Sequence, residues 1–395
     1  LLDSNGDVVV GALDNAPDPD LTPYATNTAL SSNYYNKTEV DTKVSGVVTK
    51  TNANPTITTN GSVGDIWANT SSGDVYICTD ATPNNNKWKN LGIGRFSVEP
   101  PAFVTGSGGT VTTSGDYKTH AFTTSGTFTI TDLGNIQGSS TMEVLLVGGG
   151  GGTGFTSNQG GNGGDSDIIY PINVTVTASG GGGGGTIGFS GNEFILGKDG
   201  GSGGGAGRNE NGTALAGLAT ASTSGVSMWE AYGFSGGDAT GGGSSAGGGG
   251  GGADQKGDNG TSNNAGVKGG NGKYFANFPD WGTNSSNSTS GVRGYFAGGG
   301  GSGGNTEGSS RGSWGGGHGL GSSTSDNRTS GQAHTGGGGG GAGSRRAGGG
   351  GAGAVLHASS LEPILGDYII NVGGAGSGTG SNGGSGIVLI RYKYQ

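Results

Sequence analysis

The sequence predicts a mainly β protein that ends in a bundle of extended glycine helices and begins with a short helical stalk. Three observations lead to this fold class. Most of the 99 glycines follow residue 147, and many form uninterrupted runs. Two aliphatic, β-branched segments of strand length flank the glycine-rich part, at residues 142–147 and 387–394. Large aromatic residues are interspersed among the runs, whereas flexible linkers lack them.

The glycine runs have similar lengths, so we expect each to form one element of a common bundle. A chain in polyproline-II geometry rises ~3.1 Å per residue, and six glycines therefore span about 19 Å. Such helices have no internal hydrogen bonds, and glycine lacks a Cβ, so neighbouring backbones can bond each other. Disorder is the alternative; collagen is excluded by the 10 prolines and the missing Gly-X-Y period. The runs are residues 148–152, 180–185, 247–252, 298–301, 336–341 and 348–351.

The order of segments predicts four regions. Residues 1–56 form a fibre stalk, 57–98 a small β module, 99–141 a β connecting segment, and 142–395 a glycine-rich tip domain. Within the β module, Trp67, Tyr76 and Trp88 supply the predicted core, with Cys78 buried in a strand. Outside the two flanking segments, strands are expected at residues 64–67, 74–78, 87–91, 120–124, 127–130, 168–176 and 368–372.

A short helix is predicted over residues 36–48 of the stalk. Asn36 is a suitable N-cap, and Glu39 completes a capping box three residues later. Val40, Val44 and Val47 follow at helical spacing and form a narrow apolar stripe. A helix of this length is not stable alone. We therefore expect it to associate with copies of itself in a homotrimer; the alternative is that it packs on its own domain.

Charge and composition exclude several classes of protein. The formal net charge of −9 argues against a nucleic-acid partner. A single cysteine excludes an intrachain disulfide, and no apolar stretch has the length of a membrane span, so membrane insertion is not expected. The chain begins with Leu1 and has no recognisable signal peptide, so we expect a fragment of a longer protein or an upstream part that is not included.

The sequence contains no convincing catalytic, cofactor or metal site. The Gly-x-Gly-x-x-Gly pattern around Gly203 is expected by chance at this glycine content, and no helix follows it. None of the four histidines has zinc-ligand spacing, and no Ser–His–Asp arrangement can be nominated. A depolymerase would need clustered carboxylates, whereas Glu193, Glu210, Glu230 and Glu307 are scattered. We therefore expect a protein that is not an enzyme and that needs no cofactor or metal.

Three long insertions separate the glycine runs, at residues 208–235, 253–297 and 305–335. If the runs form a bundle, these insertions are expected to emerge at its ends as loops. Rigid aromatic side chains lose little rotamer entropy on binding. Each of them also has a structural alternative, in which it holds its loop against the glycine bundle. The candidate binding residues are Trp229, Tyr232, Phe234, Tyr274, Trp281, Tyr295, Trp314 and His318.

Several segments together resemble phage tail-fibre proteins. Residues 34–43, Tyr-Tyr-Asn-Lys-Thr-Glu-Val-Asp-Thr-Lys, are similar to a short motif of trimeric fibre stalks. Residues 64–92 are similar to β modules of fibre-like proteins, and the start (143–152) and end (384–392) of the C-terminal part resemble glycine-rich fibre tips. Adhesins of T-even-like phages use a polyglycine sandwich whose variable loops contact the host receptor. This chain departs from them because stalk and tip are fused.

The resemblance implies a receptor-binding tail-fibre protein, located in the virion and extracellular. The implied partners are a bacterial outer-membrane protein or surface glycan, two further copies of the chain, and upstream fibre or virion proteins. Two alternatives remain at this stage. One is a bacterial cell-surface glycine-rich adhesin, and the other, less favoured because of the aromatic insertions, is an ice-binding protein.

Overall fold

The computed structural model consists of β-strands and irregular glycine-rich segments, without a helix among the residues that it describes. It divides into two compact units, Leu1–Pro100 and Pro101–Gln395, which we describe separately. In the part of the chain that the structure describes, no helix is long and apolar enough to span a membrane. The predicted helix over 36–48 lies outside the described residues except for Val48, which begins a strand. The described residues are 48–91, 97–98, 100–155, 158–187, 196–209, 212–222, 228–240, 246–261, 265–285, 291–304, 312–319, 328–343 and 346–395.

The first unit holds one sheet with the strand order β1-β2-β3-β4-β5. Its strands are β1 (Val48–Thr51), β2 (Ile66–Asn69), β3 (Val75–Asp80), β4 (Lys87–Asn90) and β5 (Ser97–Val98). Tyr76, Cys78 and Trp88 form the buried core, and the Trp67 ring packs edge-on against Trp88 at 5.8 Å between centroids. The predicted core of the β module is therefore confirmed. Its boundary differs, because β1 pairs in parallel with β2 and belongs to this sheet instead of to a stalk.

The second unit contains two antiparallel sheets that face each other. The six-stranded sheet has the order β13-β16-β10-β18-β8-β7, and the five-stranded sheet has the order β12-β11-β17-β9-β6. The strands of the first are β7 (Thr110–Ser114), β8 (Tyr117–Phe122), β10 (Met142–Val147), β13 (Glu230–Tyr232), β16 (Val355–Leu361) and β18 (Ile387–Lys393). Those of the second are β6 (Val104–Ser107), β9 (Gly126–Leu133), β11 (Ser166–Ile169), β12 (Thr175–Ala178) and β17 (Gly366–Asn371). A mainly β fold is therefore confirmed.

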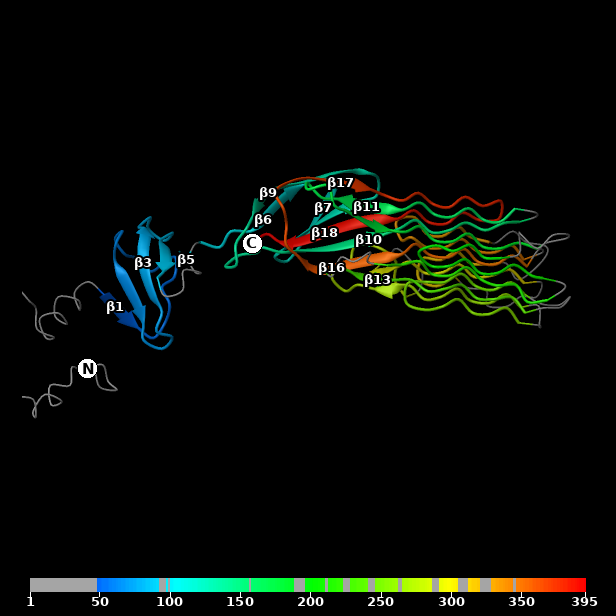
Figure 1. Ribbon diagram of the computed structural model, residues 1–395, viewed down its shortest axis with the longest axis horizontal. Coiled ribbons are helices and arrows are strands. Elements are labelled where there is room, and N and C mark those ends of the chain that lie inside the picture. The colour runs from blue at the N-terminus through cyan, green and yellow to red at the C-terminus, as the bar shows by residue number, and fades with distance from the viewer. Residues whose placement is uncertain are drawn as a thin grey trace, which may run out of the picture. The chain divides into compact units, whose positions relative to one another are not determined.

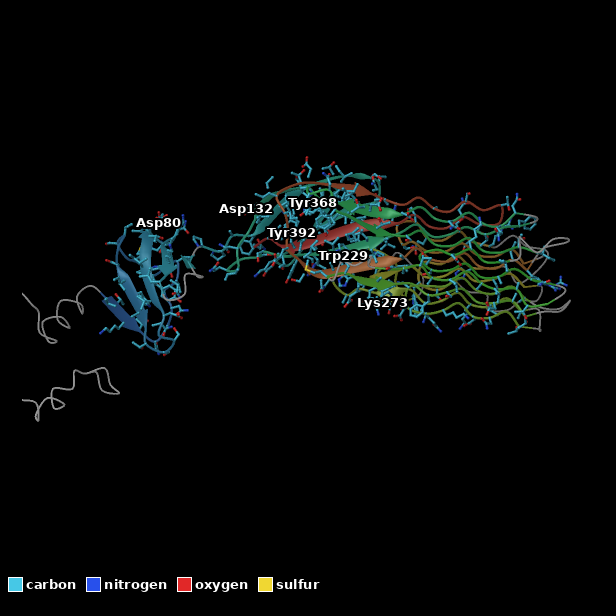
Figure 2. All side chains as sticks on the ribbon, in the orientation of Figure 1. Asp80, Asp132, Trp229, Lys273, Tyr368 and Tyr392 are labelled. Atoms are coloured by element: carbon cyan, nitrogen blue, oxygen red, sulfur yellow. The ribbon has the colours of Figure 1, made fainter. Side chains whose placement is uncertain are left out.

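The main core lies between these two sheets. Phe128 and Tyr368 of the five-stranded sheet and Tyr392 of the six-stranded sheet are fully buried there (Figure 2). Nε2 of the buried His120 lies 2.9 Å from the Tyr392 hydroxyl, and burial lowers the pKa of His120. The strand β12 alternates exposed and buried residues, whereas every residue of β10 is buried. The outer face of β10 must therefore be covered as well.

Three sequence expectations about strands need correction. The predicted strand over 168–176 is a hairpin of β11 and β12, because Pro171 and Asn173, with φ of 59°, lie in the turn between them. The predicted connecting segment 99–141 is not separate, since β8 pairs with β18 and β9 pairs with β17. The strand β16 was not predicted, although it pairs with β10 across the centre of the six-stranded sheet.

The glycine-rich segments extend from one end of the two sheets and run side by side (Figure 1). We call them the glycine lattice, its end at the strands the sheet end, and the opposite end the far end. One chain of backbone bonds illustrates the packing: Gly250 N–H donates to Gly300 O, Gly300 N–H to Gly350 O, and Gly350 N–H to Gly339 O, each at 2.9 Å. The described lattice residues are 148–155, 158–165, 179–187, 196–209, 212–222, 233–240, 246–261, 265–272, 297–304, 312–319, 328–343, 346–354 and 372–386.

Glycine is required in the lattice because neighbouring backbones occupy the space of a side chain. A Cβ on Gly250 would lie 1.9 Å from the carbonyl oxygen of Gly350 and 2.4 Å from its carbon. Gly250 does not have the positive φ that favours glycine elsewhere, so close approach is the reason for glycine at this position. The interior of the lattice is made mainly of peptide groups, and the side chains buried within it include small ones such as those of Thr153, Ser202 and Ala206.

Short polar side chains complete the hydrogen bonding at one edge of the lattice. Along residues 212–222, Ala216 N–H donates to Oδ1 of Asp238 at 2.9 Å and Leu218 N–H to Oδ1 of Asp199 at 2.6 Å. Ala219 N–H donates to the Ser235 hydroxyl at 3.3 Å. These side chains supply the acceptors that a further glycine segment would otherwise provide. The edge therefore stops without leaving these backbone donors unpaired.

Candidate functional site

Within the insertion 253–297, the described part of residues 275–294 covers the outer face of the six-stranded sheet, whereas residues 253–261 and 265–272 belong to the glycine lattice. A hairpin of β14 (Lys273–Tyr274) and β15 (Tyr295–Phe296) frames it. Phe275, Phe278 and Phe296 are buried in a second core with Leu145, Val147, Val355 and Leu389 from that face. These phenylalanines explain why β10 is buried on both sides. We call residues 275–294 the cover segment, and its described part encloses hydrophobic surface of the sheet instead of forming a free loop.

Trp229 does not reach solvent. It is 4% exposed and belongs to the main core between the two sheets (Figure 2). Its position follows from β13, which begins one residue later and pairs with β16 as an edge strand. The expectation that Trp229 contacts a ligand is therefore wrong. Trp281, within the cover segment, is only half-buried, but it packs against the second core.

The structure brings three of the candidate rings together in one row, which we call the aromatic row. Tyr274 and Tyr295 lie 4.8 Å apart between centroids, and Tyr295 stacks on Trp314 at 5.1 Å with 15° between the planes. Nε1 of Trp314 donates to Ser285 O at 3.2 Å. Tyr274 is 44% exposed, whereas Tyr295 and Trp314 are half-buried. The row therefore fixes three chain segments and presents one ring prominently to solvent.

Tyr232 lies beside the cover segment under a lysine side chain. Its ring packs edge-on against Phe275 at 5.9 Å, and Nζ of Lys273 sits 4.7 Å from its centroid. Lys273 also pairs with Asp254 at 3.1 Å. The Tyr232 hydroxyl donates to the Glu230 carboxylate. Burial, followed by this neighbouring negative charge, raises the pKa of Tyr232 to about 12, so the phenol stays protonated at neutral pH.

The insertions are arranged differently from the expected loops at the bundle ends. Lys273, next to the aromatic row, lies at the sheet end of the lattice (Figure 2). Residues 212–222, 233–235, 312–319 and 328–335 are lattice segments. Each lattice segment runs either toward the sheet end or toward the far end, and this direction determines the end at which the residues that follow it lie. The glycine runs alone do not reveal these directions.

Phe234 and His318 lie on lattice segments and are not part of the aromatic row. The Phe234 backbone bonds Gly203 and Gly252, and its ring is 44% exposed. His318 N–H donates to Thr329 Oγ1 at 2.7 Å, and its ring is half-buried. A groove of about 670 Å³ lies on the lattice surface next to the residue that follows Phe234, and its lining includes Leu196, Leu215 and Leu218. The groove was not anticipated from the sequence.

A buried polar cluster that the sequence did not reveal lies at the margin of the cover segment. Glu143 is 8% exposed and accepts hydrogen bonds from His357 Nε2 at 2.9 Å, from Asn277 Nδ2 at 2.9 Å and from Arg391 Nη1 at 3.3 Å. Burial alone raises the pKa of Glu143, but the bonds from His357 and Asn277 and the charge of Arg391 outweigh it, so the pKa lies below its ordinary value. The available signal was one acidic residue within an otherwise apolar strand.

A pocket of about 440 Å³ adjoins this cluster on the outer face of the six-stranded sheet. Arg391 and Lys393 reach it from β18 and Tyr117 from β8, while Asn277 reaches it from the cover segment. The Arg391 guanidinium lies 3.6 Å from the centroid of the Tyr117 ring. The remaining lining residues are Ile136, Gly138, Ser139, Ser140, Thr141, Met142, Glu143, Ser359 and Tyr392.

Comparison with known proteins gives no family assignment. No protein-family model, curated protein or solved structure matches the chain. Within the described ranges, no group of three or more histidine, cysteine, aspartate or glutamate side chains is placed to hold a metal ion. The aromatic row and the polar pocket are therefore judged by their own geometry.

Proposed function

We propose that this chain is the receptor-binding protein at the tip of a phage tail fibre and that it acts by binding, without catalysis. The succession of stalk, β module and glycine-rich tip, and the resemblance of residues 34–43 to fibre stalks, support this proposal. In the virion, the chain forms a homotrimer through its stalk and attaches to upstream fibre or virion proteins. Its extracellular partner is an outer-membrane protein or a surface glycan of a bacterium.

The lattice segments are proposed to be polyglycine-II helices with three residues per turn. Burial along residues 213–219 supports this geometry, because Ala214 and Gly217 are buried while Leu215 and Leu218 are exposed. A repeat of three residues is expected for this helix and differs from the repeat of two of a β-strand. Lattice segments also bond several neighbours instead of two, as the contacts of Gly250, Gly300 and Gly350 illustrate. Such a lattice is a rigid support for a binding surface.

The aromatic row is proposed as a receptor-contact surface. The observation that carries this proposal is the contact of Tyr274 with Tyr295, and the stacking of Tyr295 on Trp314, which joins the β14–β15 hairpin to a lattice segment. Because these rings are already ordered, binding orders few additional side chains. Tyr274 offers an exposed aromatic ring, which is suited to contact with a protein loop or a glycan.

The test uses fluorescently labelled full-length protein and a panel of bacterial strains. We expect it to bind a subset of strains and to block adsorption of a phage that carries it. Tyr274→Ala should reduce cell binding at least about tenfold without changing the melting temperature. Ile172→Ala is the matched control, because Ile172 is 61% exposed in the turn between β11 and β12. Wild-type protein that binds no strain and blocks no phage would contradict the function, whereas normal binding by Tyr274→Ala would remove only the aromatic row.

Oligomeric state tests the trimer independently. Sedimentation equilibrium of the full chain should give three times the chain mass of 38.1 kDa. A chain lacking residues 1–47 should give a smaller assembly if the stalk holds the trimer. A monomeric full chain would contradict the proposed trimer, and an unchanged trimer after truncation would move its interface elsewhere.

A further inference from the structure

The pocket beside Glu143 holds polar groups that fold stability alone does not require. A buried ion pair is weak as a source of stability, because the loss of hydration offsets the attraction between the charges. Glu143 and Arg391 nevertheless face each other across β10 and β18, and both are largely buried. Apolar side chains at these two positions would extend the second core. The polar pair therefore indicates a task at the surface of the sheet.

One consequence of the pair is that it fixes the side chains that line the pocket. The Glu143 carboxylate bonds Arg391 from β18 and Asn277 from the cover segment at the same time. Arg391 is further held against the Tyr117 ring, at 3.6 Å from its centroid. These contacts join a central strand, a neighbouring strand and the cover segment. The donors of Asn277 and Arg391 are thus positioned before any ligand arrives.

Each cation of the lining has a carboxylate nearby, which argues for an uncharged ligand. The carboxylate of Glu143 faces Arg391 at 3.3 Å, and Asp116, which is not part of the lining, lies 3.8 Å from Nζ of Lys393. Neither cation is left without a carboxylate, so the pocket is not arranged for a phosphate or a carboxylate. The other polar lining groups are hydroxyls, including Ser139, Ser140, Thr141 and Ser359. Such groups exchange hydrogen bonds with a ligand that is itself rich in hydroxyls.

An aromatic ring and an aliphatic side chain complete the lining. Tyr117 is 38% exposed although Arg391 covers one of its faces, and Ile136 is 66% exposed. A saccharide ring combines a hydroxyl-bearing rim with C–H groups on its faces, so it can meet both kinds of surface at once. The volume of about 440 Å³ lies within the range of small-ligand sites.

We propose that this pocket binds a neutral saccharide unit, with Tyr117 contacting the sugar face and Asn277, Arg391 and Lys393 bonding its hydroxyls. The inference rests on the proposed function in one respect: the saccharide would be part of the glycan that the fibre tip meets on the cell. The pocket is separate from the aromatic row, and the two surfaces can be tested independently.

The binding experiment is saturation-transfer difference NMR on the full-length protein. The probes are glucose, galactose, N-acetylglucosamine and rhamnose as neutral sugars, and glucuronic acid as a charged one. We expect transfer to at least one neutral sugar and little to glucuronic acid. Tyr117→Ala and Lys393→Met should each weaken that affinity about tenfold or more. Lys118→Met is the matched control, because Lys118 is adjacent in β8, is not part of the lining and lies over the Tyr394 ring instead.

The outcomes separate this inference from the proposed function. Saccharide binding that is lost in Tyr117→Ala but kept in Lys118→Met and Tyr274→Ala supports the pocket. Transfer to none of the neutral sugars, or unchanged transfer in a folded Tyr117→Ala protein, overturns it. Cell binding without any saccharide signal overturns the pocket and leaves the receptor-binding function intact. Saccharide binding without binding to any strain supports the pocket and contradicts the receptor-binding function.

Discussion

The two-sheet part and the glycine lattice bury their backbones in opposite ways. Between the sheets, side chains such as Phe128 and Tyr368 fill the interior, and backbone bonds stay within each sheet. In the lattice, peptide groups fill the interior and bond neighbours in several directions. The chain changes from one mode to the other between Val147 and Gly148. A buried backbone needs partners for its polar groups. In the lattice, the absence of side chains lets neighbouring backbones approach closely enough to be those partners.

The largest expected effect comes from a single methyl group in the lattice interior. In Gly250→Ala, the new Cβ would lie 1.9 Å from Gly350 O, and the obstacle is backbone that neighbouring segments hold in place. We expect a loss of more than about 4 kcal/mol in the free energy of unfolding, above the usual cost of an overpacked core. Urea unfolding followed by circular dichroism measures it.

Gly374→Ala is the control for this variant, because no heavy atom lies within 4 Å of a Cβ at that position. Its stability should change by less than about 1 kcal/mol. Equal effects of the two substitutions would show that glycine is needed for backbone flexibility throughout the lattice instead of for close packing.

The core between the sheets should be destabilised by substitutions that remove side-chain volume, whereas the lattice should be destabilised by substitutions that add it. Phe128 is fully buried and packs against Tyr368 and Tyr392. Phe128→Ala should cost about 3–4 kcal/mol, because it leaves a cavity, whereas Phe128→Leu should cost about 1 kcal/mol. The same urea titration measures both variants. If Phe128→Leu were as damaging as Gly250→Ala, the contrast between the two regions would disappear.

The polar cluster gives the six-stranded sheet a pH dependence through Glu143. The pKa of Glu143 is lowered from its ordinary value of 4.5, so its contribution to stability is present above that pH and is lost as the pH falls through the folded pKa. Glu143→Gln leaves Arg391 without its carboxylate and weakens hydrogen bonds to a charged group, at a cost of about 2 kcal/mol at pH 7. The melting temperatures of the two proteins should stay apart from pH 7 to pH 4.5 and converge only as the pH falls further, through the folded pKa of Glu143, and a constant difference would contradict this role.

Side chains at the lattice edge should contribute least. Asp199→Ala removes the acceptor of the Leu218 amide and should cost about 1 kcal/mol, with faster hydrogen exchange at that amide. Outside the lattice, in the turn between β7 and β8, Asp116→Ala removes an exposed ion pair with Lys393 and should cost less than about 0.5 kcal/mol. Unchanged exchange at Leu218 would mean that the edge is held by neighbouring segments alone.

The sequence predicted elements whose own residues determine them. The runs 142–147 and 387–394 match β10 and nearly match β18, because buried strands in the middle of a sheet are aliphatic on both faces. The strand β16 was missed, since His357, Ser359 and Ser360 interrupt its apolar residues and a glycine run ends a few residues before it. The turn at Pro171 and Asn173 was read as part of a strand because apolar residues lie on both sides of it.

The candidate site was harder to predict than the fold class. The sequence shows which aromatic residues lie between the glycine runs, but the end of the lattice at which they emerge depends on every reversal between glycine segments. In the sequence, Trp229 and Phe278 cannot be distinguished from Tyr274, because all three are aromatic residues between glycine runs. Only the packing in the folded chain shows that the first two are buried and that Tyr274 is exposed. Asn277 and His357, which bond Glu143, lie 134 and 214 positions after it in the sequence, and no local pattern shows such contacts.

The acceptors at the lattice edge have a consequence for growth. A set of glycine segments bonded in several directions has no inherent limit on its number of segments, because each added segment presents the same backbone donors as the one before it. At this edge, the side chains of Asp199, Ser235 and Asp238 accept hydrogen bonds from backbone donors, and these side chains do not offer the same donors to a further segment. These three residues thus limit the attachment of further chains at this edge.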